Sequence, residues 1–504
     1  MKLLFFVQRS YSAELTLRLA EHYRQRYPAA RFAALCYTLY PDAAHLRELE
    51  LFDEVHSEAQ MHQKASGEMP DLALLRRLER DYGSPTLWQF VTQNRVLTMR
   101  YFGDLFSYGS PYTRAEILSH IATRFLETEA FLDQFKPDAV IFPEVDVGPG
   151  SAFILERVAR ARDIPVIVPK SVRLGSYHTF TDTVLSRIPQ IEENFRHFRT
   201  GGVFDRERAR QVLTDFRSGQ LPLSYITYEF DQGKRSLLDK LRRALKLRLR
   251  REYVRSDPIL PTNLEYDLHK FVVVWRRLKL RLAGQFTQPE PHERYVFFPL
   301  HTEPELSLSL YAPFYTDQIA IIRNVAQSLP VDTCLYVKDH IVAQGRRHPE
   351  FFKELSGIPN VRLLEPNLSS LKLIRGADGV VSVTGTAALE AALLGKPALT
   401  FGDAFFNVLD GPIRHTHDFE AVPGLLEDFR SYQHDEEELL AFVGALLENS
   451  VAVDPLVLGK ALSLGPPDLA NRSAAFSTYA GALFNEIEAR LSKPLPSPRL
   501  SVAD

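Results

Sequence analysis

A short polar turn, residues 384–386 (Thr-Gly-Thr), has the residue types of a phosphate-binding site. It follows Val380–Val383, a β-branched run typical of a strand that is buried on both faces. Strong helix formers come next, in Ala387–Leu394, and Gly395 stands where a left-handed cap residue belongs. The free N–H groups of a helix start and the threonine hydroxyls could hold a phosphate, although a threonine-capped helix without a ligand fits the same pattern.

Glu390 lies about one helical turn into the same predicted helix. A carboxylate there could accept hydrogen bonds from sugar hydroxyls, and the alternative is an exposed glutamate that contacts only solvent. Pro397 prevents the helix from continuing, and Ala398–Phe401 is the next predicted strand. Strand, turn, helix and strand make a parallel βαβ unit. Its turn lies at the carboxyl edge of the sheet, where ligands bind in open α/β sheets.

Other polar side chains follow predicted strands at the same edge. Lys338 and His340 lie at the end of the run that starts at Leu335. They could neutralise the charge of a bound phosphate, and the alternative for His340 is a solvated loop residue. His301 and Glu305 follow a strand that starts at Tyr295, and on pattern alone they are surface loop residues.

Two carboxylates follow a predicted strand in the N-terminal half, Ala139–Phe142. Glu144 is a candidate general base, because a carboxylate at a sheet edge can take a proton from a bound hydroxyl group. Asp146 is the next candidate. A carboxylate that caps the following helix is the alternative, and a metal pair would lack a third ligand.

Four motifs follow one another in the C-terminal half: YVFFPLHTEPELS (295–307), LYVKDH (335–340), IPNVRLLEP (358–366) and VTGTAALEAALLGKPALTFG (383–402). In these motifs the chain resembles the capsular polysaccharide biosynthesis family, which includes 3-deoxy-octulosonate (Kdo) transferases of the GT-B type. It departs from the family pattern at His340-Ile341, where the family has a His-Pro pair. It also departs at Phe405-Phe406, where the family has phenylalanine and tyrosine.

The resemblance implies a GT-B fold, with two doubly wound Rossmann-like α/β domains that face one another across a cleft. It places residues 304 and 305 in the active cleft. The expected donor-binding residues are His301, Glu305, Lys338, Ser382, Thr384, Gly385, Thr386 and Glu390, and the expected catalytic residues are Glu144, His340 and Asp146.

The implied activity is metal-independent transfer of a hexose or Kdo from a nucleotide-sugar to a surface polysaccharide or glycolipid. CMP-linked Kdo is the leading donor by resemblance. A nucleotide-sugar 2-epimerase, with the same two-domain cleft, and a non-catalytic capsule-assembly subunit are the alternatives. No metal is assigned to His415, His417 and Asp418, because GT-B transferases generally need none. No cofactor is expected, since the first turn, residues 8–12, lacks the glycines of a dinucleotide fingerprint.

Composition sets broad limits on the class of protein. A chain of 504 residues can form two domains and a connector, and a net charge of -3 gives no whole-chain argument for nucleic acid. The two cysteines, Cys36 and Cys334, fit a reducing cytoplasm. The N-terminal apolar run is too short for a signal peptide, and no stretch approaches the roughly 20 apolar residues of a spanning helix. We expect the protein in the cytoplasm or on the inner face of the plasma membrane.

The expected division of the chain has five parts. These are an N-terminal Rossmann-like acceptor domain (1–203), a helical basic connector (204–291), a C-terminal Rossmann-like nucleotide-sugar domain (292–425), C-terminal helices (426–492) and a disordered tail (493–504).

The connector combines apolar stripes with dense positive charge. One stripe comprises Leu237, Leu241, Leu245 and Leu249, within the basic segment 234–255. A second comprises Phe271, Trp275, Leu278 and Leu282, flanked by Arg276, Arg277, Lys279 and Arg281. Residues 234–282 therefore fit contact with an anionic membrane surface, and a solvated helix whose apolar side packs on a domain is the alternative. Nucleic acid is not expected as a partner, because no recognised binding motif accompanies the charge.

Overall fold

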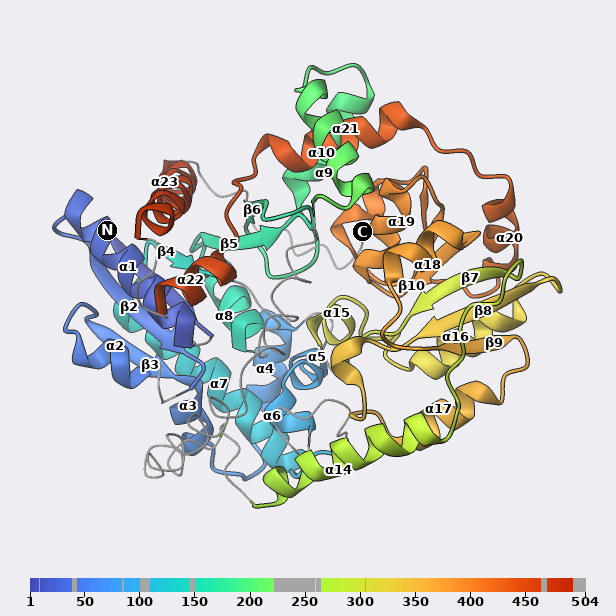
Figure 1. Ribbon diagram of the computed structural model, residues 1–504. Coiled ribbons are helices and arrows are strands. Elements are labelled where there is room, and N and C mark those ends of the chain that lie inside the picture. The colour runs from blue at the N-terminus through green and yellow to red at the C-terminus, as the bar shows by residue number, and fades with distance from the viewer. Residues whose placement is uncertain are drawn as a thin grey trace.

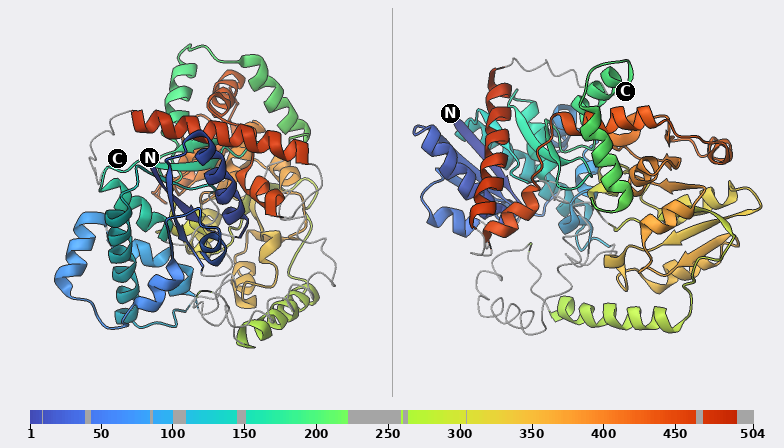
Figure 2. Two further views of the ribbon diagram at one scale, coloured as in Figure 1. Left: turned by 90° about the vertical axis from the view of Figure 1, so that its left-hand side faces the viewer. Right: turned by 45° about the horizontal axis from the view of Figure 1, so that its top comes forward.

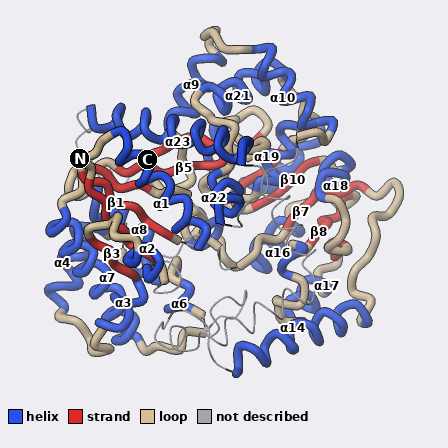
Figure 3. The backbone as a smooth tube through the Cα atoms, turned by 60° about the vertical axis from the view of Figure 1, so that its left-hand side comes forward, coloured by secondary structure: helices blue, strands red, loops and turns tan. Residues whose placement is uncertain are grey.

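The computed structural model describes residues 1–8, 10–38, 43–83, 86–99, 109–144, 151–221, 259, 264–303, 305–463 and 469–492. These residues form two α/β units, and each is built on a six-stranded sheet with helices on its faces (Figure 1). Figure 3 shows the strands of both sheets enclosed between helices.

The N-terminal sheet has the strand order β3-β2-β1-β4-β5-β6. Its strands are β1 (Lys2–Val7), β2 (Arg31–Cys36), β3 (Glu54–Ser57), β4 (Ala139–Ile141), β5 (Val166–Ser171) and β6 (His178–Thr181). All pairs are parallel except β5 with β6. Leu3–Val7 is buried throughout, as a continuous apolar strand covered on both faces should be. The strand order reverses between β1 and β4, so this is the switch point of the sheet.

The helices around this sheet are α1 (Ser10–Arg26), α2 (Ala44–Glu48), α3 (Glu58–Lys64), α4 (Leu72–Tyr82), α5 (Trp88–Thr92), α6 (Arg95–Thr98), α7 (Arg114–Phe135) and α8 (Ser151–Arg160). The longest, α7, begins with a capping box in which Thr113 and Glu116 each accept a hydrogen bond from the other's backbone. The stretch between residues 58 and 112 contains the short helices α3 to α6.

The C-terminal sheet has the order β12-β11-β10-β7-β8-β9. Its strands are β7 (Arg294–Pro299), β8 (Thr333–Lys338), β9 (Val361–Leu364), β10 (Gly379–Ser382), β11 (Ala398–Thr400) and β12 (Ile413–His415), and all pairs are parallel. In chain order both sheets therefore have the 3-2-1-4-5-6 arrangement of a doubly wound domain. The fold class expected from the sequence is confirmed.

The helices of the C-terminal unit are α14 (Leu264–Leu282), α15 (Leu306–Ser309), α16 (Gln318–Gln327), η2 (Ile341–Ala343), α17 (Pro349–Ser356), α18 (Ser370–Gly376), α19 (Thr386–Leu393), η3 (Phe405–Val408), α20 (Val422–Glu427) and η4 (Asp428–Arg430). The predicted βαβ unit is present as β10, α19 and β11, with β10 and β11 parallel. Gly395 has a φ of 76°, the left-handed conformation expected of the residue that ends the helix.

Five further helices connect the two units. α9 (Pro189–Arg199), α10 (Arg206–Ser218) and α21 (Glu436–Glu448) pack in one core with α19. Arg217 of α10 donates to both carboxylate oxygens of Glu436, at 2.7 and 2.9 Å. α22 (Pro455–Ser463) and α23 (Leu469–Ser492) return to the N-terminal sheet (Figure 2). α9 ends before residue 203 and α10 begins after it, and both helices pack in this one core. The division of the chain into domains at residue 203 remains a prediction.

Part of the expected connector lies outside the described residues. This holds for the leucine stripe and the basic residues of segment 234–255, and for the tail from residue 493. Within the described part of the chain, every helix is too short or too polar to cross a bilayer.

Candidate functional site

The switch point of the C-terminal sheet brings two predicted loops together. The strand order reverses between β7 and β10, so the loop after Pro299 and the turn after Ser382 are neighbours at the carboxyl edge. This is the position at which open α/β sheets bind ligands. Predicted residues from three motifs, around positions 301, 338 and 384, converge on it.

His301 connects the two loops through its imidazole ring. Its Nε2 accepts a hydrogen bond from the Thr384 amide at 3.3 Å and lies 3.2 Å from the Ser382 hydroxyl. The Ser382 hydroxyl oxygen in turn accepts from the Gly385 amide at 3.0 Å, so its own proton can point to Nε2. Two donors at Nε2 place the ring proton on Nδ1. Burial, together with the charge of Arg347 and neighbouring His340, lowers the pKa of His301 to about 3, so the ring is neutral at physiological pH.

Some polar groups of the turn at residues 384–386 already form hydrogen bonds with other parts of the protein. The Thr384 hydroxyl donates to the Ser307 carbonyl at 2.7 Å, so it fixes the loop of residues 300–309 rather than pointing to a ligand. The Gly385 amide already donates to Ser382, whereas Thr386 is half-buried and opens α19, whose first amides have no partner within the helix. These backbone amides are therefore the groups of the turn that a phosphate could reach.

Glu390 is buried one turn further along α19, with only 6% of its surface exposed. Thr386 Oγ1 lies 3.5 Å from Glu390 Oε1. Burial raises the pKa of this carboxyl to about 7, opposed by the Thr386 hydroxyl and by the charge of Lys338. The alternative of an exposed glutamate is excluded, and Glu390 titrates in the physiological range.

Lys338 ends β8 and is also buried. Its ammonium donates to the Pro366 carbonyl at 3.4 Å. Burial lowers the pKa of Lys338, while the charges of Asp339 and Glu390 act in the opposite direction. The charge of Lys338, at the end of β8, and the carboxyl of Glu390, in α19, therefore influence one another electrostatically.

His340 lies two residues beyond the end of β8. Its backbone amide donates to the Asp339 carboxylate at 2.9 Å, and the η2 helix begins at the next residue, Ile341. Burial and the positive charges of Lys338 and Arg347 lower the pKa of His340 to about 4. This ring is therefore neutral at physiological pH. A bound phosphate would have to raise the pKa of His340 before the ring could neutralise the phosphate charge.

Arg347 holds the loops after β7 and β8 in place. In the sequence it is only one more charged residue near a strand end, so it could not be predicted as part of the site. Its guanidinium is buried and donates to Asp339 at 3.1 Å and to Glu303 at 3.0 Å. It also donates to the backbone carbonyl of His301. Gln318 of α16 accepts from the His301 amide at 2.8 Å, so two side chains fix the backbone of the histidine.

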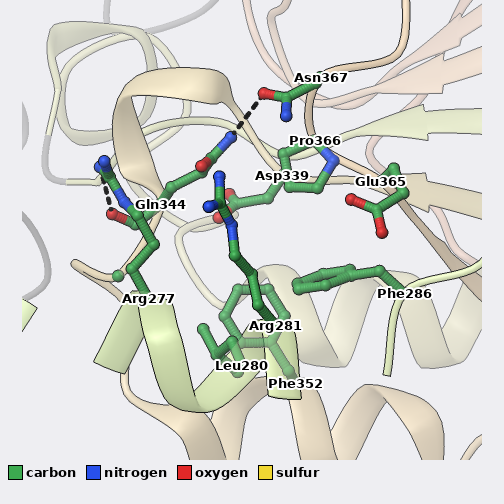
Figure 4. A pocket seen from close by; sticks show the side chains of 11 residues that line it. Arg277, Leu280, Arg281, Phe286, Asp339, Gln344, Phe352, Glu365, Pro366 and Asn367 are labelled. Carbon is green, nitrogen blue, oxygen red and sulfur yellow. Dashed lines mark hydrogen bonds between the residues drawn. The ribbon is translucent and has the colours of Figure 1, made fainter. Parts of the chain in front are cut away.

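A cavity of about 30 Å³ lies beside this site, between α14 and the ends of β8 and β9 (Figure 4). Arg277 and Arg281 of α14 line one side, and Asp339 and Pro366 line the other. The second carboxylate oxygen of Asp339 is buried there and has no hydrogen-bond partner among the described residues. The volume suits one or two water molecules, so this cavity is not a sugar site.

The loop that contains Glu305 leads into residues that contact the N-terminal unit. Glu305 is half-buried, and its backbone carbonyl accepts from Ser309 at 2.8 Å. Beyond it, Leu310 packs into the core of the N-terminal unit. The Tyr311 hydroxyl accepts from Lys170 of β5 at 3.1 Å and donates to the Val184 carbonyl at 3.1 Å. The segment that Thr384 fixes therefore contacts both units.

Glu144 follows β4 at the switch point of the N-terminal sheet. Its side chain is 1% exposed. The Tyr479 hydroxyl of α23 donates to the preceding Pro143 carbonyl at 2.6 Å, and burial, with the nearby Glu144 charge, raises the Tyr479 pKa. Asp146 lies outside the described residues. The catalytic roles of both carboxylates stay predictions.

Three exposed side chains could offer ligands to a metal ion. Asp403, His415 and His417 have ligand atoms within 4.8 Å of one another at the carboxyl ends of β11 and β12. In the sequence Asp418 is the carboxylate nearest to the two histidines. In the structure Asp403 lies beside them instead. The absence of a functional metal remains a prediction.

Comparison with known proteins agrees with the motifs of the C-terminal half. Residues 262–412 match the sequence model of the family described as "Capsule polysaccharide biosynthesis protein". Protein FixF of Sinorhizobium fredii (strain NBRC 101917 / NGR234) is 27% identical over 169 residues, which are 32% of this chain and 39% of that protein. The chain therefore spans well under half the length of this curated relative.

Similar solved structures include the Thermosulfurimonas dismutans KpsC beta Kdo 2,4 transferase, at 15% identity and a TM-score of 0.34 over 61% of this chain and 79% of that chain. The UDP-GlcNAc 2-epimerase from Neisseria meningitidis, bound to UDP-GlcNAc, gives 13% identity and a TM-score of 0.30 over 92% and 100% of the two chains. The family match rests on sequence, and it includes the strands and loops that form the switch point. Residues 262–412 of this chain thus match the capsule polysaccharide biosynthesis family, which the resemblance of the motifs indicated.

Proposed function

We propose that the protein is a glycosyltransferase that moves a sugar from a nucleotide-sugar to a surface polysaccharide or glycolipid acceptor. The family match of residues 262–412 supports a transferase of the capsule polysaccharide class. The observation that carries the proposal is the contact of His301 with Ser382 and with the Thr384 amide. This contact fixes the start of α19 at the switch point, where a nucleotide phosphate can bind.

In this proposal the donor phosphate binds to the first amides of α19, beside Thr386. Lys338 supplies positive charge to the leaving phosphate, and Glu390 accepts hydrogen bonds from the sugar. Glu305 and His340, in the loops after β7 and β8, are the other side chains proposed to contact the donor. His301 acts through the position it gives to Ser382 and Thr384.

Glu144 is the proposed base on the acceptor side, with Asp146 as the second candidate. Because the Glu144 side chain is buried, an acceptor hydroxyl reaches it only after a local rearrangement at the end of β4. Segment 306–312, which contacts both units, offers a route for coupling donor binding to that rearrangement.

The finer assignments follow the resemblance. CMP-linked Kdo is the proposed donor, and the reaction is proposed to need no metal. The protein is proposed to work in the cytoplasm, attached peripherally to the inner face of the plasma membrane.

A panel of nucleotide-sugars, with and without glycan acceptors, tests the proposal. Nucleotide release that requires an acceptor supports transfer. Conversion of one nucleotide-sugar into another without acceptor would instead make the protein an epimerase. If no donor reacts under either condition, the chain is a non-catalytic subunit. Addition of a chelator tests the metal-independent part, since the rate should not change.

Two variants test the named residues. The double variant Thr386→Ala/Glu390→Ala should weaken nucleotide binding at least about tenfold, measured by calorimetry, because it removes two polar side chains beside the phosphate site. The exposed pair Thr478→Ala/Glu207→Ala is the matched control. Glu144→Gln should keep donor affinity and lose turnover. Unchanged affinity in the first variant removes the donor-site assignment, and wild-type turnover in the second moves the base elsewhere.

A further inference from the structure

Helix α14 presents an apolar face to solvent. The exposed stripe consists of Phe271 (72% exposed), Val274 (66%), Trp275 (59%), Leu278 (56%) and Leu282 (79%). Their spacing of three, four, seven and eleven residues from the first member puts them on one side of the helix. Large apolar side chains gathered in this way on a protein surface mark an interaction site.

The opposite face of α14 fixes the orientation of the helix. Leu280 is buried in the core of the C-terminal unit. The Arg277 guanidinium donates to the Gln344 carbonyl at 3.1 Å, and the backbone of Val273 passes so close to Gly345 that a Cβ there would meet its carbonyl oxygen at 2.4 Å. Figures 1 and 2 show α14 along the outer margin of the molecule, and Figure 4 shows its inner side facing the ends of β8 and β9. The exposed stripe therefore points outward from a well-packed helix.

Positive charge surrounds the exposed stripe. Residues 271–282 contain Arg276, Arg277, Lys279 and Arg281 and no acidic residue. The Lys279 ammonium lies 5.3 Å from the centre of the Trp275 ring, so it sits directly beside the apolar face. A helix with tryptophan, phenylalanine and leucine on one side and cationic side chains along its edges is typical of one that lies in a membrane interface.

We propose that the exposed stripe of α14 binds an anionic phospholipid bilayer, with Trp275 at the headgroup level and Lys279 on a lipid phosphate. The charge favours lipid over a second copy of the chain, because two copies facing one another through this stripe would bring their cationic residues together. The inference concerns a surface distinct from the donor site, and its test does not depend on the transfer reaction.

The chain offers a direct probe, because it has two tryptophans, Trp88 and Trp275. In a Trp88→Phe variant, the fluorescence of Trp275 alone reports on the stripe. We expect its emission to shift to shorter wavelength when vesicles containing phosphatidylglycerol are added, and to shift much less with phosphatidylcholine vesicles. Two sets of substitutions separate the contributions: Phe271→Ser/Leu278→Ser/Leu282→Ser tests the apolar side chains, and Lys279→Gln tests the charge beside Trp275.

Each surface variant should bind phosphatidylglycerol vesicles about tenfold more weakly in a sedimentation assay. The matched control is Phe314→Ser/Val331→Ser, which removes two exposed apolar side chains, 83% and 106% exposed, from other parts of the surface. It should bind like the wild type. Circular dichroism checks that each variant keeps its helices.

Three outcomes would overturn the proposal. Trp275 emission that is already at short wavelength without vesicles means that another part of the chain covers the stripe. A shift that depends on protein concentration and not on vesicles means that a second copy covers it. Equal binding of the control and the stripe variants, or no binding to anionic vesicles, means that α14 is not a lipid-binding surface.

Discussion

The two histidines at the C-terminal switch point are neutral at physiological pH, and Glu390 is partly protonated. Burial lowers the pKa of His301 to about 3 and that of His340 to about 4, and it raises that of Glu390 to about 7. Positive charge for a phosphate therefore comes from Lys338 and the helix start, with His340 able to contribute only when a bound anion raises its pKa.

Replacing Glu390 with glutamine should change how stability depends on pH. A carboxyl whose pKa rises from 4.5 to about 7 on folding binds its proton more tightly in the folded chain. Its contribution is therefore most favourable below pH 4.5 and is lost as the pH rises through about 7. Glu390→Gln stays neutral, so relative to the wild type it should gain on the order of 1–3 kcal/mol between about pH 5 and about pH 8.

Urea unfolding of both proteins at the two pH values measures this difference. Glu354→Gln, at an exposed position, is the control and should leave the pH dependence unchanged. A constant difference in unfolding free energy between wild type and Glu390→Gln would contradict the raised pKa.

Arg347→Met should destabilise the C-terminal unit by about 3–5 kcal/mol, because it leaves the buried carboxylates of Asp339 and Glu303 without their cation. Chemical denaturation measures the loss. The triple variant Arg347→Met/Asp339→Asn/Glu303→Gln removes the unpaired charges as well and should recover a large part of it. If the triple variant is no more stable than the single one, packing of the arginine and not its charge explains the effect.

The residues around Arg347 show where prediction from the sequence stops. Lys338, His301 and the turn at 384–386 could be placed at one edge because each follows a buried strand, and the structure brings them together. The partners of Arg347 come from two loops whose meeting depends on strand order, which a single sequence does not specify. Likewise, the Thr384 hydroxyl could not be assigned to the Ser307 carbonyl before the loop path was known.

At the scale of elements, local signals predicted the βαβ unit closely. β10, α19 and β11 differ from their expected bounds by a residue or so, because buried β-branched runs, helix formers and a glycine cap all favour the same structure. In the short helices α5 and α6 the local sequence signals do not agree on one structure. Their buried residues, including Phe90 and Leu97, pack against the N-terminal core, so tertiary contacts determine them.

Ile341→Pro should be tolerated, although it changes the turn that carries His340. Ile341 opens the η2 helix, where a proline φ fits and no intrahelical N–H bond is lost. We expect the free energy of unfolding to change by less than about 1 kcal/mol. Lys353→Pro, in the interior of α17 and 75% exposed, is the contrasting control and should cost about 3 kcal/mol. A comparable loss for both would mean that the turn at residue 341 requires its backbone N–H.

Leu483→Ala should weaken the attachment of α23 to the N-terminal unit. Leu483 is fully buried with Leu3 and Phe5 of β1 in one core. The lost burial and the cavity should cost about 2–5 kcal/mol in thermal or chemical unfolding. Asn485→Ala, at an exposed position of the same helix, is the control. Equal stability of the two variants would show that α23 does not depend on this contact.

At the scale of the whole molecule, segment 306–312 connects the donor loop with the N-terminal sheet. Tyr311→Phe removes a hydroxyl that bonds both Lys170 and the Val184 carbonyl. We expect a loss of about 1 kcal/mol in stability and a lower turnover with unchanged nucleotide affinity. Calorimetry and steady-state assays separate the two. Tyr315→Phe, whose hydroxyl bonds the His417 carbonyl within the C-terminal unit, is the control.

The return of α23 to the N-terminal sheet has a consequence for biosynthesis. β1 and α1 are translated before the C-terminal unit, and the helix that packs with them, residues 469–492, emerges only after that unit has been made. Until then the nascent chain exposes the apolar surface around Leu3 and Phe5, and ribosome-bound chaperones would have to shield it. Premature termination before residue 469 would leave that surface uncovered and make the truncated product prone to aggregate.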